Sequence, residues 1–172
     1  MRSVIALVLL AASASFIGAV RSGNVAEVRQ MLARGADPNA PEGVNEWTPL
    51  LHAVHKNQPG SVAALLDGHA DPNRAVNGMT PLMMAAGYRY TPIVRLLLAH
   101  GADPRIQGLD GETAVDYAVI GMTDIDRFTF FSCGDETVHA ILAAHAPRTI
   151  SRAARRWGML KRCSSLALLQ TR

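Results

Sequence analysis

Residues 80–104 read TPLMMAAGYRYTPIVRLLLAHGADP, and both ends of this segment return elsewhere in the chain. The aspartate of its closing Ala-Asp-Pro recurs at intervals of 34 and 32 residues, at Asp37, Asp71 and Asp103. The threonine that opens it recurs at intervals of 32 and 33 residues, at Thr48, Thr80 and Thr113. Two independent markers that keep step at about 33 residues indicate stacked helical repeats.

Each repeat is expected to hold two helices. Thr48 and Thr80 can cap a first helix with their hydroxyls, and the proline after each suits the first helical position because no N–H is needed there. A second, apolar helix is expected over residues 28–32, 62–66 and 93–98. Gly35 and Gly101 follow two of these helices, where glycine takes the left-handed conformation at least cost.

With Thr80-Pro81-Leu82, Ala85-Ala86, Leu96-Leu97-Leu98 and Gly101-Ala102-Asp103 in these places, the chain resembles the ankyrin-repeat family. The resemblance runs from Phe16 to about Pro147. It divides the chain into four repeats, at residues 15–39, 40–73, 74–105 and 106–147, the last with an insertion at 121–134. It implies an all-α solenoid of helix-turn-helix units joined by short β-turn or hairpin fingers.

Two departures from the family pattern carry structural expectations. Leu51, Met83 and Asp116 replace the family's usual histidine, so its hydrogen-bond bridge between repeats is expected to be absent. His69 and His145 stand where a helix-ending glycine is usual, which predicts less favourable helix ends in the second and fourth repeats.

The resemblance also places a partner-binding site. Partners of this family usually contact the finger tips and the exposed side of the first helices. The matching positions are Asn45, Trp47, His55, Lys56, Asn77, Met79, Tyr88 and Glu112, with Arg89 and Tyr90 as further candidates. Tryptophan and tyrosine are enriched in interface hot spots, which favours Trp47 and Tyr88 as anchors. The alternative for Trp47 is packing on its own hairpin or on the neighbouring finger.

The insertion in the fourth repeat carries Phe128, Phe130 and Phe131, three of the four phenylalanines of the protein. Insertions in solenoids map to loops on one face and are often functional, which makes these residues a candidate second site. The alternative is a structural lid folded over the last repeat, because exposed phenylalanines invite aggregation.

Residues 1–14 have the layout of a secretory signal peptide. Arg2 precedes an apolar run of nine residues, Val4 to Ala12, and Ala12-Ser13-Ala14 has the small-x-small form of a cleavage site. The sequence therefore predicts export, to the periplasm in a bacterium or into the medium. The alternative is an apolar capping helix on the first repeat of a cytoplasmic protein.

The net charge of +3 combines two opposite parts. Residues 1–147 hold ten basic and fourteen acidic residues, whereas residues 148–172 hold seven basic residues and no acidic one. A helical wheel puts Ile150, Ala153, Ala154, Trp157, Leu160 and Ala167 on one side of this tail and most arginines on the other. Three interpretations stay open: a cap on the last repeat, a helix that binds an anionic surface, or a disordered tail.

Signs of enzyme chemistry are few. The chain has no glycine-rich phosphate loop, no Gly-x-Ser-x-Gly and no His-Glu-x-x-His. His52 and His55 lack a third metal ligand at a readable spacing, and a Cys133 and His139 pair is weak support for a nucleophile. Cys133 and Cys163 are expected to be unpaired thiols, with one disulfide as the alternative. We expect no cofactor, no metal and no catalytic residue.

The function expected from these observations is protein binding by a monomeric, exported ankyrin-repeat protein with an accessory or protective role. The alternative is an adaptor attached through its basic C-terminal helix to an anionic surface, either membrane or nucleic acid. Because the basic charge belongs to the tail alone, nucleic-acid binding by the whole molecule is not indicated.

Overall fold

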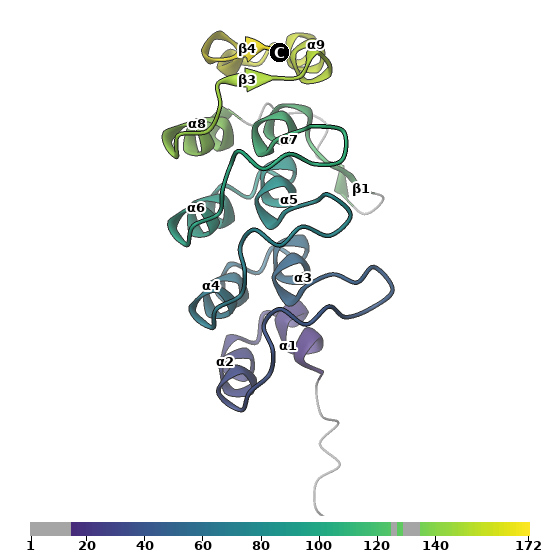
Figure 1. The fold of residues 1–172 in the computed structure, drawn as a ribbon, viewed down its shortest axis with the longest axis vertical. Coiled ribbons are helices and arrows are strands. Elements are labelled where there is room, and N and C mark those ends of the chain that lie inside the picture. Colours follow the sequence, from purple (N-terminus) through teal and green to yellow (C-terminus); the bar gives the residue numbers. More distant parts are fainter. Residues whose placement is uncertain (1–14, 125–126, 129–134) are drawn as a thin grey trace, which may run out of the picture.

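The protein is described here by a computed structural model over residues 15–124, 127–128 and 135–172. Four helix pairs are stacked along one axis (Figure 1). The pairs are α1 Phe16–Ser22 with α2 Val25–Ala33, α3 Pro49–His55 with α4 Pro59–Asp67, α5 Pro81–Gly87 with α6 Thr91–Ala99, and α7 Ala114–Ile120 with α8 Asp135–Ala143. The first helices form one layer and the second helices another, which confirms the predicted all-α solenoid.

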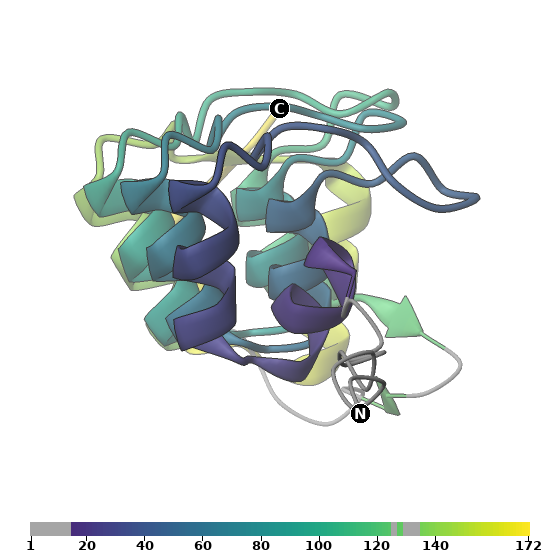
Figure 2. The ribbon, with the colours of Figure 1, turned by 90° about the horizontal axis from the view of Figure 1, so that it is seen from below.

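The loops between pairs project to one side as fingers (Figure 2). Antiparallel bridges close the first two fingers, between Glu42 and Trp47 and between Val76 and Met79. In the third finger the Gly108 N–H donates to the Glu112 carbonyl at 2.8 Å. The first finger extends beyond the others in both ribbon views.

The first helices begin as the sequence predicts. The Thr48 hydroxyl accepts a hydrogen bond from the Leu51 N–H at 3.3 Å, and the Thr80 hydroxyl accepts one from the Met83 N–H at 3.1 Å. Each threonine thus satisfies one of the backbone donors left free at a helix start.

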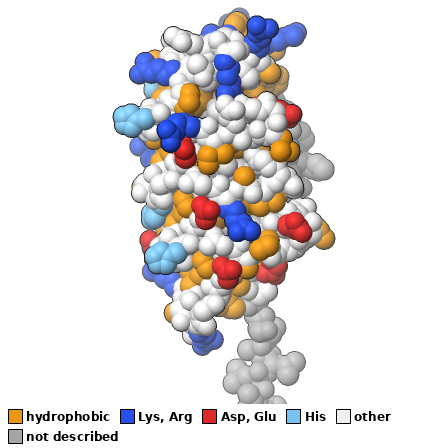
Figure 3. Space-filling model, viewed as in Figure 1, with side chains coloured by type: hydrophobic (Ala, Val, Ile, Leu, Met, Phe, Trp, Pro, Cys, Tyr) orange, Lys and Arg blue, Asp and Glu red, His pale blue; other side chains and the backbone are white. Residues whose placement is uncertain are grey.

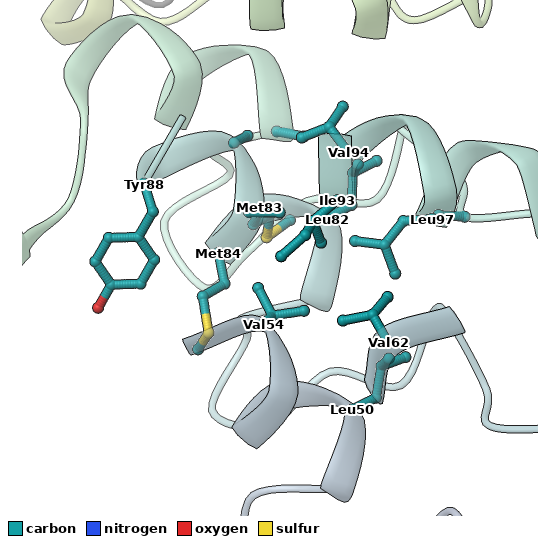
Figure 4. Packing of buried hydrophobic residues seen from close by; sticks show 14 of the residues in the cluster. Leu50, Val54, Val62, Leu82, Met83, Met84, Tyr88, Ile93, Val94 and Leu97 are labelled. Atoms are coloured by element: carbon teal, nitrogen blue, oxygen red, sulfur yellow. The ribbon is translucent and has the colours of Figure 1, made fainter. Parts of the chain in front are cut away.

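The core lies between the two helix layers and between successive pairs. Figure 4 shows Leu82, Ile93 and Leu97 of one pair facing Leu50 and Val62 of the pair before it. All five side chains are buried. Ala85 and Ala86, also buried, allow the first helices to approach closely. Because each pair packs on its neighbours, apolar burial is continuous along the solenoid.

Asparagine side chains join successive repeats at the start of the first two fingers. Asn39 donates from its amide to the His69 carbonyl at 3.2 Å and accepts from the Asp71 N–H at 2.8 Å. Asn73 repeats this arrangement on Gly101 and Asp103, at 3.0 and 2.7 Å. The repeats are therefore bridged here by residues for which the sequence analysis predicted no role.

The histidines at the helix ends do adopt the left-handed conformation. The φ angles of His69 and His145 are 67° and 61°, close to the glycine values of 94° at Gly35 and 87° at Gly101. A side chain with a Cβ is strained at such angles, so this prediction is confirmed.

Replacing His69 with glycine is expected to raise the free energy of unfolding by about 0.5–1 kcal/mol, because it removes this strain. The bond from Asn39 to the residue 69 carbonyl would be kept. Gly35→Ala is the matched opposite change. No atom lies within 4 Å of the Cβ it would add, so its cost of about 1 kcal/mol would come from the backbone alone. Urea unfolding measures the free energy of unfolding of both variants. A destabilised His69→Gly variant would contradict backbone strain at His69.

The C-terminal segment closes the solenoid. It holds β3 Thr149–Ile150, α9 Arg152–Lys161, the 3₁₀ helix η1 Ser164–Leu168 and β4 Gln170–Thr171, with β3 and β4 paired in parallel. Ala154 of α9 is fully buried, and the Trp157 indole N–H donates to the Ile120 carbonyl at the end of α7. Of the three interpretations of the tail, the structure shows the cap.

Asp116 makes buried polar contacts between the last repeat and the C-terminal segment. Its buried carboxylate accepts from the Thr113 N–H at 2.8 Å and from the Ser151 N–H at 2.6 Å, and it pairs with the Arg172 guanidinium. Asp116, which replaces the family's histidine, thus joins the fourth repeat to the cap. A carboxylate can do so because it accepts several hydrogen bonds at once.

The predicted face of the tail needs a correction. Leu160 is 71% exposed and Ala153 and Ala167 are also exposed, although the helical wheel placed all three on the packed side. The buried stripe of α9 is centred on Ala154 and Gly158 instead. Ala167 lies in η1 beyond the end of α9, so a single wheel does not apply to it.

Two predicted features fall wholly or partly outside the described residues. Of the insertion, β1 Thr123–Asp124 and β2 Arg127–Phe128 form an antiparallel pair, and Phe130 and Phe131 lie outside the description. Residues 1–14 also lie outside it. Among the described helices, none is long and apolar enough to span a bilayer.

Cys163 is disulfide-bonded in the structure, so the expectation of an unpaired thiol is wrong for this residue. Cys133, the other cysteine of the chain, lies outside the described residues.

Candidate protein-binding face

A row of aromatic rings runs from the first finger across two first helices. The Trp47 ring lies 5.5 Å from that of His52 and 5.1 Å from that of His55, measured between centroids. His55 lies 5.9 Å from Tyr88, which stacks on Tyr90 at 5.4 Å. We call these five residues the aromatic band. The band brings together predicted site residues from two repeats.

Exposure along the band is uneven. Trp47, His52, His55 and Tyr90 are partly exposed, whereas Tyr88 is only 5% exposed. Tyr88 contacts His55 on one side and Tyr90 on the other, and the Met122 N–H donates to the Gly87 carbonyl beside it. The chain that follows α7 therefore passes close to the end of α5. The prediction that Tyr88 offers an exposed contact was wrong.

Trp47 packs on the helix that follows its finger, and not on the hairpin or neighbouring finger named as the alternative. Its ring packs on the histidines of the following helix, and part of its surface still reaches solvent. Such a ring is held in place before a partner arrives, so little side-chain entropy is lost on binding.

The other predicted contacts are accessible. Asn45 and Asn77 are exposed at the finger tips, while Lys56, Met79 and Glu112 are partly exposed. The structure adds two tip residues that the sequence analysis did not select, Val44 at 102% and Leu109 at 82% exposure. No local pattern marked them, because only the projection of the fingers shows that they lack a packing surface.

Carboxylates surround these apolar tips. Glu42 and Glu46 flank Val44 and are exposed, and Asp110 and Glu112 follow Leu109. We call the aromatic band together with the three finger tips the finger face. It offers apolar and aromatic surface with a mainly acidic rim.

A shallow hollow of about 320 Å³ lies between α1 and the first finger. Arg21 of α1 and Glu42 and His52 of the second repeat line it, with Ser15, Ile17, Gly18 and Gly43. The His52 Nε2 lies 3.2 Å from the Glu42 carbonyl, so this histidine connects the finger to α3.

Burial is the main cause that lowers the pKa of His52 below its usual value, with the hydrogen bond to Glu42 acting against it. The unfolded chain therefore takes up a proton at this residue at a higher pH than the folded protein does, and acid favours unfolding. Between about pH 7.5 and pH 5.5, on either side of the usual histidine pKa of about 6.5, the wild type should lose more stability than His52→Gln. Urea unfolding at both pH values tests this; equal losses would contradict it.

The structure places the histidines that were weighed for metal or nucleophile chemistry. In the described part of the chain, no three His, Cys, Asp or Glu side chains gather closely enough to hold a metal ion. His52 and His55 both contact Trp47, and His139 is exposed on α8.

Stacked helix pairs with a row of fingers and a partly exposed aromatic band define a helical-repeat binding scaffold. A family model described as ankyrin repeats (3 copies) matches residues 16–108 and 61–127, more than half of the chain. The chain belongs to the ankyrin-repeat family. Ankyrin repeats are protein–protein interaction modules.

Relatives match over parts of their length. The chain is 46% identical to mouse 2-5A-dependent ribonuclease over 72 residues, which are 41% of this chain and 10% of that protein. It is 35% identical over 101 residues to an ankyrin repeat-containing protein of Treponema pallidum, covering 58% of this chain and 34% of that protein. A BTB/POZ domain and ankyrin repeat-containing protein of Lotus japonicus is 51% identical over 57 residues, which are 32% of this chain and 12% of that protein. The chain thus spans about a third or less of these relatives, and the ribonuclease activity belongs to a protein of which only a tenth is matched.

Proposed function

We propose that this protein is a binding module that holds a partner protein against its finger face. The observation that carries the proposal is the aromatic band, which continues from a projecting finger onto two first helices while part of its surface stays exposed. Partly exposed rings in fixed positions are typical of interface anchors.

The charge of the finger face indicates the kind of partner surface. Glu42, Glu46, Asp110 and Glu112 surround apolar tips, so a partner with lysine or arginine beside apolar residues is complementary to it. Aromatic rings can also receive a cation over their faces.

A double variant, Trp47→Ala with His55→Ala, tests this proposal. We expect it to stay folded and to lose at least tenfold in affinity for the partner, since hot-spot residues typically contribute about 2 kcal/mol or more each. Arg29→Ala with Arg34→Ala, at exposed positions in α2 and directly after it, is the matched control and should bind like the wild type.

The partner would first be captured from cells of the native source with tagged protein and identified by mass spectrometry. Isothermal titration of the purified pair then gives the affinities of the wild type and both variants. Wild-type affinity in the Trp47 and His55 variant, or equal losses in both variants, would exclude the finger face as the site.

We further propose that the protein is exported and acts as an accessory or protective protein in the periplasm or outside the cell. The apolar run near the N-terminus supports this, as does the disulfide at Cys163, because disulfides persist mainly in oxidising compartments. Fractionation of native cells and intact mass of the purified protein test it. Export predicts a mature chain that begins near Ser15; a cytoplasmic chain that retains residues 1–14 would contradict it.

A further inference from the structure

The cap helix α9 has a second face that the solenoid does not use. Its inner face packs on the last repeat through Ala154 and Gly158, which are buried. Its outer face exposes Arg152 and Arg156 together with Met159 and Leu160, at 57% and 71% exposure. Capping therefore uses one side of this helix and leaves the opposite side exposed.

A groove of about 400 Å³ lies on this outer face, and its walls are mainly apolar. It is lined by Arg152, Arg155, Arg156, Met159, Leu160 and Thr171. Figure 3 shows basic and hydrophobic side chains together at this end of the molecule. The groove therefore combines three guanidinium groups with apolar surface that is open to solvent.

The positive charge of this face is not neutralised within the described part of the chain. The ion pair that the structure gives for residues 148–172 joins Arg172 to Asp116, and there neither Arg152 nor Arg156 pairs with an acidic side chain. Arg155 donates to the Leu169 carbonyl, and its buried Nε has no hydrogen-bond partner among the described residues. The exposed guanidinium groups of Arg152 and Arg156 are therefore the donors available for an anion.

We propose that the outer face of α9 docks the protein on an anionic lipid bilayer. The arginines bind lipid phosphates, and Met159 and Leu160 enter the region where headgroups meet acyl chains, as in interfacial amphipathic helices. This inference goes beyond the proposed binding of a protein partner.

Two observations favour lipid over nucleic acid. Met159 and Leu160 gain from an acyl environment, whereas a phosphate backbone offers no apolar surface to match them. Trp157, the aromatic residue of α9, turns inward to the Ile120 carbonyl, so it is not placed to stack on bases.

The position of the groove leaves the finger face free. The cap closes one end of the solenoid, whereas the fingers project from its side (Figures 1 and 2). A protein docked through α9 would stand on the membrane by its C-terminal end and present its aromatic band to a partner.

Co-sedimentation of the purified full chain with vesicles tests this proposal. We expect binding to vesicles that contain phosphatidylglycerol, weak binding to phosphatidylcholine alone, and a steep loss at high ionic strength. Arg152→Gln with Arg156→Gln should weaken binding about thirtyfold, since each basic residue near an anionic surface contributes about a factor of five. Met159→Ser with Leu160→Ser should weaken binding at every ionic strength, because it removes the apolar contact.

Arg29→Gln with Arg34→Gln is the matched control, because it removes two exposed arginines at the opposite end of the solenoid. It should bind vesicles like the wild type, and circular dichroism should show all variants folded. If the two arginine variants lost affinity for vesicles equally, the effect would come from net charge alone, and the proposal would be overturned. No binding to phosphatidylglycerol vesicles would also overturn it, and so would tighter binding to an oligonucleotide that displaces them.

Discussion

Asp116→Ala is expected to lower the free energy of unfolding by about 4 kcal/mol, because it removes a buried acceptor shared by three partners. Asp116 is fully buried. Without its carboxylate the N–H groups of Thr113 and Ser151 lose their acceptor, and Arg172 loses its ion pair. The loss would fall on the last repeat and the cap, since in a solenoid each unit is stabilised by its neighbours.

The two tryptophans make it possible to measure in which part of the solenoid Asp116→Ala lowers stability. Trp47 lies in the first repeats and Trp157 in the cap, at opposite ends of the solenoid. Unfolding in urea, followed by fluorescence with Trp47 replaced by phenylalanine, reports on the cap. Asp110→Ala, which removes an exposed carboxylate of the third finger, should change stability by less than about 0.5 kcal/mol. A cap that unfolds at the wild-type urea concentration in Asp116→Ala would disprove the role of this residue.

Leu97→Ala is expected to destabilise the protein by about 3–4 kcal/mol, the range for a leucine removed from a packed core. Leu97 is fully buried in α6 and fills the space between two helix pairs with Ile93 and Val62 (Figure 4). Truncation leaves a cavity at the centre of the solenoid, where the surrounding helices cannot close it without losing other contacts.

Leu160→Ala is the control for this change, because the same atoms are removed from a side chain that is 71% exposed. Leu160→Ala should change the free energy of unfolding by less than about 0.5 kcal/mol. A loss below about 1 kcal/mol for Leu97→Ala would show that the helix pairs pack less tightly than the structure indicates.

The repeat architecture was predictable because its signals are local. A threonine cap, a proline at the first helical position and a residue in the left-handed conformation at the helix end each act within one turn of helix. Thr48, Thr80 and Gly101 therefore marked the helix limits directly. The bridges of Asn39 and Asn73 act between repeats, across about 30 residues of chain, and nothing beside those asparagines in the sequence indicated their partners.

The candidate site was predictable only in part, for the same reason. Family positions placed Trp47 and His55 on one surface, and the structure brings their rings to 5.1 Å. The burial of Tyr88 depends on Tyr90 and on the path of the chain after α7, which lies outside any repeat pattern. A helical wheel could not predict which side of α9 is exposed either, because contact with the last repeat decides which residues of the helix are buried.

The two proposed binding surfaces, the finger face and the cap groove, are separate on the solenoid. One is acidic and aromatic and lies along the side, and the other is basic and apolar and lies at the end. High ionic strength should weaken attachment to vesicles strongly, because it screens the arginines from the lipid phosphates, while the apolar and aromatic part of partner binding should persist.

Site-specific photo-crosslinking in native cells shows whether a partner binds the finger face. A photoreactive residue would replace Asn45 or Asn77 at the finger tips, and Arg29 or Arg95 on the outer helices α2 and α6 in the matched set. The account predicts one crosslinked partner from both finger positions and none from the outer helices. A partner that crosslinks to the outer helices and not to the finger positions would contradict binding at the finger face.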